Sequence, residues 1–149
     1  VPILGICFGA QALATALGGS VERAPEPEIG WYAIETDRPD LVEAGPWFQW
    51  HHDRFDPPPG AQVLARTDIC PQAYVIGRSL GVQFHPELTP EQLEGWLGNG
   101  GDVYLEAHAI DGAAMRAETD RTAVEAQARS RRLVDRFLDE VARVPSATV

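Results

Sequence analysis

Apolar runs and turn residues alternate at the start of the chain in the order of an α/β domain. Residues 1–6 are almost entirely apolar and predict a buried strand, and residues 10–17 follow as a short apolar helix. Gly18 and Gly19 supply the stop signal for that helix. A strand, a glycine-flanked turn and a helix in direct succession indicate an α/β unit with a parallel strand.

Short apolar segments separated by proline and glycine continue the pattern through the middle of the chain. Residues 20–23 and 30–36 predict two strands, which the stretch APEPEIG separates. After the stretch DPPPGA, three closely spaced segments predict an antiparallel meander at the edge of a larger sheet: residues 61–66, 73–76 and 80–84. The four tryptophans are expected in the core or at its rim, with Trp31 and Trp50 as candidates to line a site.

From Thr89 the pattern becomes helical. Thr89 suits an N-cap and Gln92 completes a capping box around Pro90, while residues 98–101 end this helix. A helical segment is expected over about residues 110–143, and its last long helix is expected to begin near Thr122. The predicted core-facing stripe of that helix consists of Val134, Phe137, Leu138 and Val141. Residues 1–144 therefore predict one domain, and residues 145–149 a frayed tail.

Charge and composition exclude several classes of partner. The net charge of −10 opposes non-specific binding to nucleic acid and to anionic membranes. The one basic cluster, residues 129–132, is flanked by acidic residues and is expected to be a solvated helix face. No apolar run reaches the length of a membrane span. Two cysteines do not make a disulfide framework, so the expected compartment is reducing and cytoplasmic.

The stretch GICFGAQ carries the first candidate for chemistry. Gly5 and Gly9 flank Cys7 directly after an apolar strand, which is typical of a nucleophile presented on a tight strand-to-helix turn. The amino end of the following helix would stabilise a thiolate, and the Phe8 N–H would face an oxyanion formed beside it. A free cysteine is otherwise most often a buried small residue, and that is the role expected for Cys70.

A cysteine nucleophile needs a base and a group that orients the base. In the stretch GVQFHPE, His85 follows an apolar strand, which would place it at the carboxyl edge of a sheet. Residues two apart on extended backbone face the same side, so Glu87 could accept a hydrogen bond from the His85 ring. The sequence therefore predicts a triad of Cys7, His85 and Glu87.

The pair His51-His52, followed by Asp53, suggests a metal site at first sight. Adjacent histidines on extended backbone point to opposite faces, and no other ligands stand at spacings typical of zinc sites. His108 lies in an acidic stretch and is expected at the surface. No metal site is predicted.

Together, PILGICFGAQALA, WHHDRF and LGVQFHPE resemble the class I glutamine amidotransferases of the Cys-His-Glu triad type. The resemblance covers residues 1–97, and the C-terminal helical segment is similar to that of stand-alone members related to the glutaminase domain of GMP synthase. It implies a flavodoxin-like α/β fold, a mostly parallel sheet flanked by helices with a small antiparallel edge. It also implies glutamine as substrate, no cofactor, and a synthase that accepts ammonia in trans.

The resemblance assigns a role to each matching residue. Cys7 would be the nucleophile, His85 the general base and acid, and Glu87 the partner that orients His85. Phe8 would supply a backbone oxyanion donor, and Gln11 would contact the bound glutamine. The backbone of His52 and Asp53 would hold the α-amino and α-carboxylate groups of the substrate.

Two departures from the family pattern leave alternatives open. His52 stands where the family usually has glycine, so hydrolysis of γ-glutamyl amides or peptides by the same triad is a second hypothesis. A non-catalytic regulatory domain is a third. Family members also have an amino-terminal part whose glycine-rich loop donates the second oxyanion N–H, and this chain starts after it. Loss of one such donor costs about 3 to 4 kcal/mol, so we expect the 149-residue chain alone to be poorly active.

Overall fold

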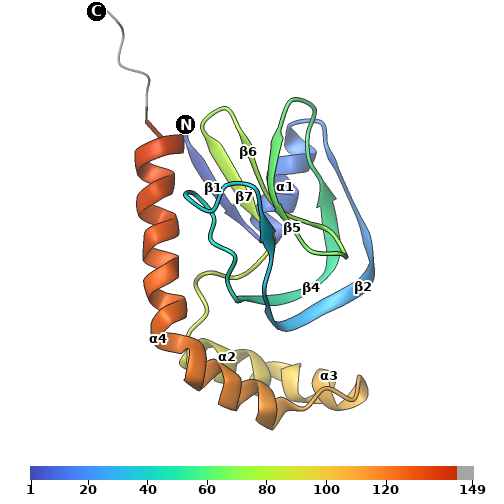
Figure 1. The fold of residues 1–149 in the computed structure, drawn as a ribbon. Helices are drawn as coiled ribbons and strands as arrows, with labels where there is room; N and C mark the ends of the chain where they lie inside the picture. Colours follow the sequence, from blue (N-terminus) through green and yellow to red (C-terminus); the bar gives the residue numbers. More distant parts are fainter. Residues whose placement is uncertain (144–149) are drawn as a thin grey trace, which may run out of the picture.

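In the computed structural model, residues 1–143 form two sheets and a set of helices (Figure 1). The predicted tail, residues 145–149, lies outside the described residues. The strands are β1 (Ile3–Ile6), β2 (Ser20–Tyr32), β3 (Glu35–Thr36), β4 (Trp47–Asp56), β5 (Gln62–Arg66), β6 (Pro71–Ile76) and β7 (Ser79–Val82). The helices are α1 (Phe8–Ala16), α2 (Pro90–Trp96), α3 (Asp102–Ala107) and α4 (Gly112–Arg136), with a kink at Leu97–Gly101, where Asn99 and Gly100 are not helical, and a π-helical turn at Phe137–Val141.

The larger sheet is mixed and has the strand order β1-β7-β6-β5-β3. β1 and β7 pair in parallel, with Ile6 opposite Val82, and β5, β6 and β7 form the predicted antiparallel meander. The expectation that β1 is fully buried was wrong for the described chain. β1 pairs only with β7 among the described strands, and this edge position leaves Ile3 44% exposed.

β2 and β4 form a separate antiparallel ribbon. The prediction of two strands on either side of APEPEIG was wrong, because β2 runs through this stretch as one strand. The two prolines fall within an irregularity of the register between Arg23 and Glu28, where a strand tolerates residues that cannot donate a ladder hydrogen bond. Pairing resumes with Glu28 directly opposite His51.

The helical half begins with the predicted capping box, in which the Thr89 hydroxyl accepts from the Gln92 N–H while the Gln92 side chain accepts from the Thr89 N–H. α4 begins at Gly112 and not near Thr122, because the Asp111 side chain caps it by accepting from the Ala114 N–H at 3.0 Å. α3, a separate helix that the sequence did not predict, follows the kink at residues 97–101.

Of the four residues predicted to face the core from the last helix, the structure confirms two. Phe137 and Val141 are buried, whereas Val134 and Leu138 are exposed. The third buried member is Leu133, four residues before Phe137, so the buried face follows the i, i+4 row.

α4 connects the two halves of the molecule. Figure 1 shows α2, α3 and the start of α4 as a base below the strands, while the end of α4 rises beside β1. Along β4, successive side chains point to opposite faces and pack in different hydrophobic cores. Trp47 packs in the sheet core and stacks on Phe84 at a ring distance of 4.4 Å, and Phe48 packs in the core of the helical base.

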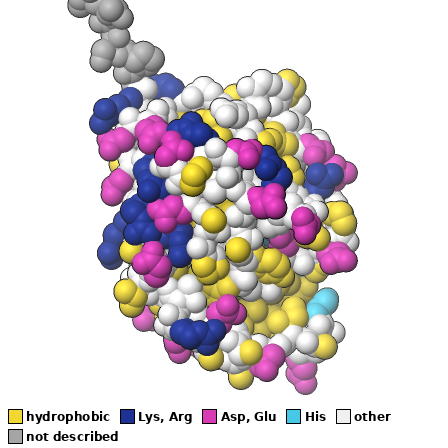
Figure 2. All heavy atoms as spheres, viewed as in Figure 1, with side chains coloured by type: hydrophobic (Ala, Val, Ile, Leu, Met, Phe, Trp, Pro, Cys, Tyr) yellow, Lys and Arg dark blue, Asp and Glu magenta, His cyan; other side chains and the backbone are white. Residues whose placement is uncertain are grey.

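Basic side chains gather over α4, as Figure 2 shows, but the predicted solvated face was wrong for one of them. Arg129 is 5% exposed, donates from Nη1 to the Pro46 carbonyl at 2.6 Å, and lies over the Trp47 ring. Arg132 and Arg136 both pair with Glu43. Among residues 1–143, no helix has the length and apolar character needed to cross a membrane.

Candidate active site

Cys7 occupies the turn between β1 and α1 with φ 46° and ψ −107°, a conformation that residues other than glycine rarely adopt. Its N–H donates to the Val82 carbonyl at 2.8 Å, and its carbonyl accepts from the N–H groups of Ala10 and Gln11. These three hydrogen bonds fix both sides of the residue. The backbone strain is thus located at the predicted nucleophile itself.

His85 stands beside Cys7 because β1 and β7 run in parallel and end at the same edge of the sheet. Its backbone N–H donates to the Phe48 carbonyl at 2.8 Å, and its ring lines the same cleft as Cys7, close enough for the thiol to raise the pKa of the imidazole. The ring nitrogen Nδ1 lies 2.7 Å from Glu87 Oε1. The structure therefore brings together the three residues of the predicted triad.

The charge state of His85 depends on opposing influences. Burial lowers the pKa of the imidazole, but the hydrogen bonds and charges of Cys7 and Glu87 outweigh it and raise the pKa to about 9. A protonated His85 next to Cys7 is the arrangement that favours a cysteine thiolate.

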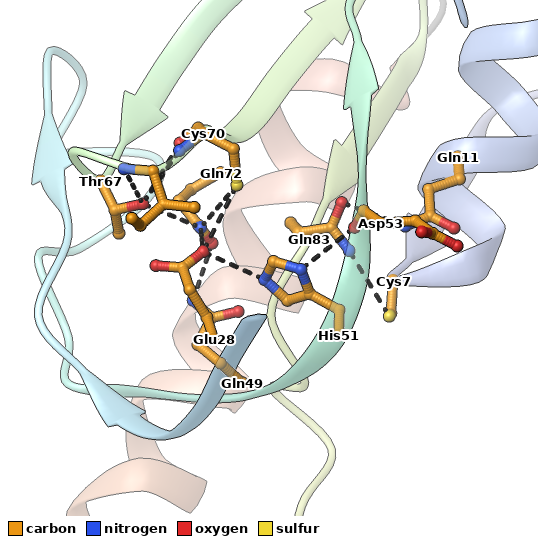
Figure 3. Close-up of polar contacts among 11 residues, drawn as sticks. Cys7, Gln11, Glu28, Gln49, His51, Asp53, Thr67, Cys70, Gln72 and Gln83 are labelled. Atoms are coloured by element: carbon orange, nitrogen blue, oxygen red, sulfur yellow. Dashed lines mark hydrogen bonds and ion pairs between the residues drawn. The ribbon is translucent and has the colours of Figure 1, made fainter. Parts of the chain in front are cut away.

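Gln83 is a site residue that the sequence analysis missed. Its buried side chain donates from Nε2 to Cys7 Sγ at 3.5 Å and accepts from Gln11 Nε2 at 3.4 Å (Figure 3). The available signal was alternation, since Gln83 stands two positions before His85 in the segment that directly follows β7.

The residues predicted to bind substrate divide into two groups. The Gln11 side chain donates to the Asp53 carbonyl at 3.0 Å, which ties α1 to β4 close to Cys7 (Figure 3). The His52 ring instead lies against Tyr104, at a ring distance of 5.3 Å, with Nδ1 3.2 Å from an Arg23 guanidinium nitrogen. Burial and the Arg23 charge lower the pKa of His52. Contact of these groups with a substrate stays a prediction.

An aromatic cleft of about 510 Å³ opens beside the triad. It is lined by Cys7, Trp50, His85, Trp96, Asn99, Gly100, Gly101 and Tyr104. Trp50 thus lines the site as expected. Trp31 does not, because it packs on Phe48 and donates to the Thr119 hydroxyl at 2.9 Å. The wall that the kink and α3 contribute was not foreseen.

The second cysteine is held in a different environment. Cys70 is buried, and burial together with the nearby Glu28 carboxylate raises the pKa of its thiol to about 12. A thiol in this state is a poor nucleophile, so within the described residues the chemistry of a cysteine nucleophile falls to Cys7.

The model of the family Glutamine amidotransferase class-I matches residues 1–102. The chain belongs to this family. Curated relatives include the glutamine-hydrolysing GMP synthase of Aeropyrum pernix, 44% identical over 110 residues, which cover 64% of this chain and 21% of the relative. That of Thermus thermophilus is 39% identical over 104 residues, covering 63% and 21%. The chain therefore spans about a fifth of the length of these relatives.

Solved structures of glutamine amidotransferases confirm the fold. One from Thermotoga maritima superposes with a TM-score of 0.83 at 33% identity, over 94% of this chain and 64% of that one. One from Methylobacillus flagellatus superposes with a TM-score of 0.85 at 24% identity, over 100% of this chain and 67% of that one. The described sheet is thus part of the α/β fold of the class I glutamine amidotransferases.

Proposed function

We propose that this class I glutamine amidotransferase chain hydrolyses the side-chain amide of glutamine through a γ-glutamyl thioester on Cys7. The observation that carries the proposal is the triad geometry, in which the His85 ring lines one cleft with Cys7 and lies 2.7 Å from Glu87 Oε1, at the carboxyl ends of two paired strands. The names of the relatives, glutamine-hydrolysing GMP synthases, support glutamine as the substrate.

The first step is acyl transfer to sulfur. The Cys7 thiolate attacks the side-chain carbonyl carbon of glutamine, and the oxygen becomes an oxyanion. Phe8 is the first residue of α1, so its N–H has no carbonyl within the helix to bond and is free to stabilise that charge. His85 then donates its proton to the amide nitrogen, which departs as ammonia. The γ-glutamyl thioester remains on Cys7.

The second step returns the enzyme to its starting state. Neutral His85 takes a proton from water as the water attacks the thioester, and glutamate leaves with Cys7 as thiolate beside protonated His85. Glu87 holds the His85 ring through Nδ1, which keeps the other ring nitrogen directed at the reacting atoms. A synthase that acts in trans would receive the ammonia.

The decisive experiment is glutamate release from glutamine, measured with the wild type and with Cys7→Ala. We expect the variant to lose at least about 10³-fold in kcat/KM, because no other group replaces the nucleophile. Acid-quenched protein is also analysed by mass spectrometry for a γ-glutamyl adduct on the peptide that carries Cys7. Equal glutamate release by both proteins, or an adduct elsewhere, would contradict the proposal.

The aromatic cleft favours a second candidate, hydrolysis of γ-glutamyl amides by the same triad. Its volume exceeds what a glutamine side chain fills, and Trp50, Trp96 and Tyr104 offer an apolar wall for an amine substituent. Parallel assays with glutamine and γ-glutamyl anilide separate the two. A higher kcat/KM for the anilide, lowered by Trp96→Ala, would favour the second candidate over glutamine itself.

A further inference from the structure

A buried cluster of three side chains with metal-binding groups lies apart from the triad, where β2, β4 and the start of β6 meet (Figure 3). Glu28, His51 and Cys70 are 1%, 4% and 4% exposed, and their ligand atoms all lie within 4.8 Å of one another. We propose that these three residues bind one zinc ion, a site that the triad chemistry does not use.

The separations of the ligand atoms suit a tetrahedral centre. His51 Nε2 lies 3.1 Å and Cys70 Sγ 3.3 Å from Glu28 Oε2. Nitrogen, oxygen and sulfur ligands sit roughly 2.0 to 2.3 Å from zinc, which places neighbouring ligands of a tetrahedron about 3.3 to 3.7 Å apart. Small side-chain shifts that move these atoms slightly apart would therefore let them surround an ion.

The orientation of His51 points the same way. Nδ1 lies 3.1 Å from the Asp53 carbonyl, and a carbonyl can only accept, so Nδ1 carries a hydrogen. In the neutral tautomer with its hydrogen on Nδ1, the lone pair of Nε2 would face Glu28 Oε2, which is also an acceptor. Nε2 has no aligned hydrogen-bond partner among the described residues. A proton on Nε2 or a metal ion between the two atoms would satisfy this contact, and the titration below distinguishes them.

The surroundings supply the support that metal ligands usually have. The Asp53 carbonyl fixes the His51 ring, as backbone carbonyls commonly do for zinc-binding histidines. Gln72 donates to Glu28 Oε2 at 2.7 Å and is itself held by Gln49 at 2.7 Å. Glu28 Oε1 is buried without a hydrogen-bond partner among the described residues, so one carboxylate oxygen is free to bind an ion.

Two surface hollows give an ion access to the cluster. A cavity of about 420 Å³ reaches Glu28 and another of about 450 Å³ reaches Cys70, and both are lined by Thr67, Asp68 and Ile69. The Thr67 hydroxyl or a water molecule entering there would complete four ligands.

The ligand set selects the metal. One imidazole, one carboxylate and one thiolate favour zinc over magnesium or calcium, which prefer oxygen ligands. On binding, the Cys70 thiol releases its proton to solvent as the sulfur–zinc bond forms, and no electron is transferred. Since the Asp53 carbonyl also accepts from Gln11, the ion would fix the segment of β4 next to the active site.

The experiment titrates the metal-free protein with Zn²⁺ by calorimetry and with Co²⁺ by absorption. We expect one ion per chain, a thiolate-to-cobalt charge-transfer band, and a thermal midpoint that rises with Zn²⁺. Cys70→Ser keeps a donor to Glu28 and should fold, but it should lose the band and bind Zn²⁺ at least about 100-fold more weakly. Glu28→Gln should also weaken binding.

Cys7→Ala is the matched control for the other cysteine and should keep the band and the affinity. Absence of stoichiometric Zn²⁺ binding by the wild type would overturn the proposal and assign the cluster to a buried His51–Glu28 ion pair. Binding that survives Cys70→Ser, or that disappears in Cys7→Ala, would also overturn it. If Cys70→Ser fails to fold, the charge-transfer band in Cys7→Ala still decides, because Cys70 is then the one thiol in the chain.

Discussion

The candidate active site depends on individual residues held in energetically costly states. Cys7 is a non-glycine residue at positive φ, a conformation that costs on the order of 1 to 3 kcal/mol and persists only where surrounding contacts fix it. Val82, Ala10 and Gln11 supply those contacts through the backbone. His85 is largely buried and yet favours its protonated form, because Cys7 and Glu87 compensate for lost hydration.

At the residue scale, Glu87→Gln should lower the pKa of His85, because the amide removes a negative charge 2.7 Å from Nδ1. We expect a decrease of roughly one unit from the value of about 9, measured by NMR titration of the ring. Glu91→Gln, four residues further along, is the control and should leave the titration unchanged. An unaltered His85 pKa in Glu87→Gln would show that Glu87 does not act on His85.

The same shift gives stability a defined pH dependence. The folded protein holds the His85 proton with a pKa of about 9, above about 6.5 in an unfolded chain, so this stabilisation is fully present below about pH 6.5. It is lost as the pH rises through 9. Urea unfolding should therefore show a fall of about 2 to 3 kcal/mol between pH 6.5 and 9 that is smaller in Glu87→Gln. Identical pH profiles of the two proteins would refute this.

At the scale of elements, the contact between β1 and α1 sets the nucleophile turn. A Cβ atom on Gly5 would lie 2.8 Å from the Gly9 carbonyl oxygen, whereas one on Gly9 would meet nothing within 4 Å. The two glycines of GICFGAQ therefore differ in role. Gly5 permits the close approach of strand and helix, and Gly9 leaves the space beside Cys7 open.

This difference predicts opposite effects of one substitution. Gly5→Ala should destabilise the protein by about 1 to 3 kcal/mol, because helix backbone must move away from β1. Gly9→Ala should be neutral or stabilising by up to about 1 kcal/mol, since alanine favours the helix. Chemical denaturation of both variants measures the difference. Equal stability of the two would contradict the packing argument.

Local patterns predicted the elements that depend on neighbouring residues, namely the β5–β7 meander, the Thr89 capping box and the turn at Cys7. The start of α4 was missed because the Asp111 cap lies before a weakly apolar stretch. The Glu28–His51–Cys70 cluster could not be predicted from the sequence, for another reason. Its members come from separate strands, with Glu28 and Cys70 42 positions apart, and no spacing rule covers such a set. The Cys7–His85–Glu87 triad was predictable because each part has its own short motif.

At the scale of the molecule, α4 fastens the helical base to the sheet. Arg129 crosses between them, with its guanidinium bonded to the Pro46 carbonyl and lying 5.4 Å from the Trp47 ring centroid. Arg132 and Arg136 add ion pairs to Glu43 nearer the surface. The buried contact is the one that fixes α4.

Arg129→Met should therefore lower the free energy of unfolding by about 1 to 3 kcal/mol, because methionine keeps the apolar stem but leaves the Pro46 carbonyl unpaired. Arg131→Met, which changes an exposed arginine two residues away, is the matched control and should stay within about 0.5 kcal/mol of the wild type. Thermal and urea unfolding of the two variants measure this. Similar free energies of unfolding for the two variants would show that the Arg129 contact does not fix α4.

The parallel pairing of β1 with β7 also bears on the order of folding. Cys7 and Gln83 touch across 76 positions of sequence, while β5, β6 and β7 pair with their immediate neighbours along the chain. Closing so long a loop is slow compared with forming a local meander. The thiol would then meet His85 only in the last stage of folding. A nascent or partly folded chain would therefore hold the Cys7 thiol apart from its histidine neighbour.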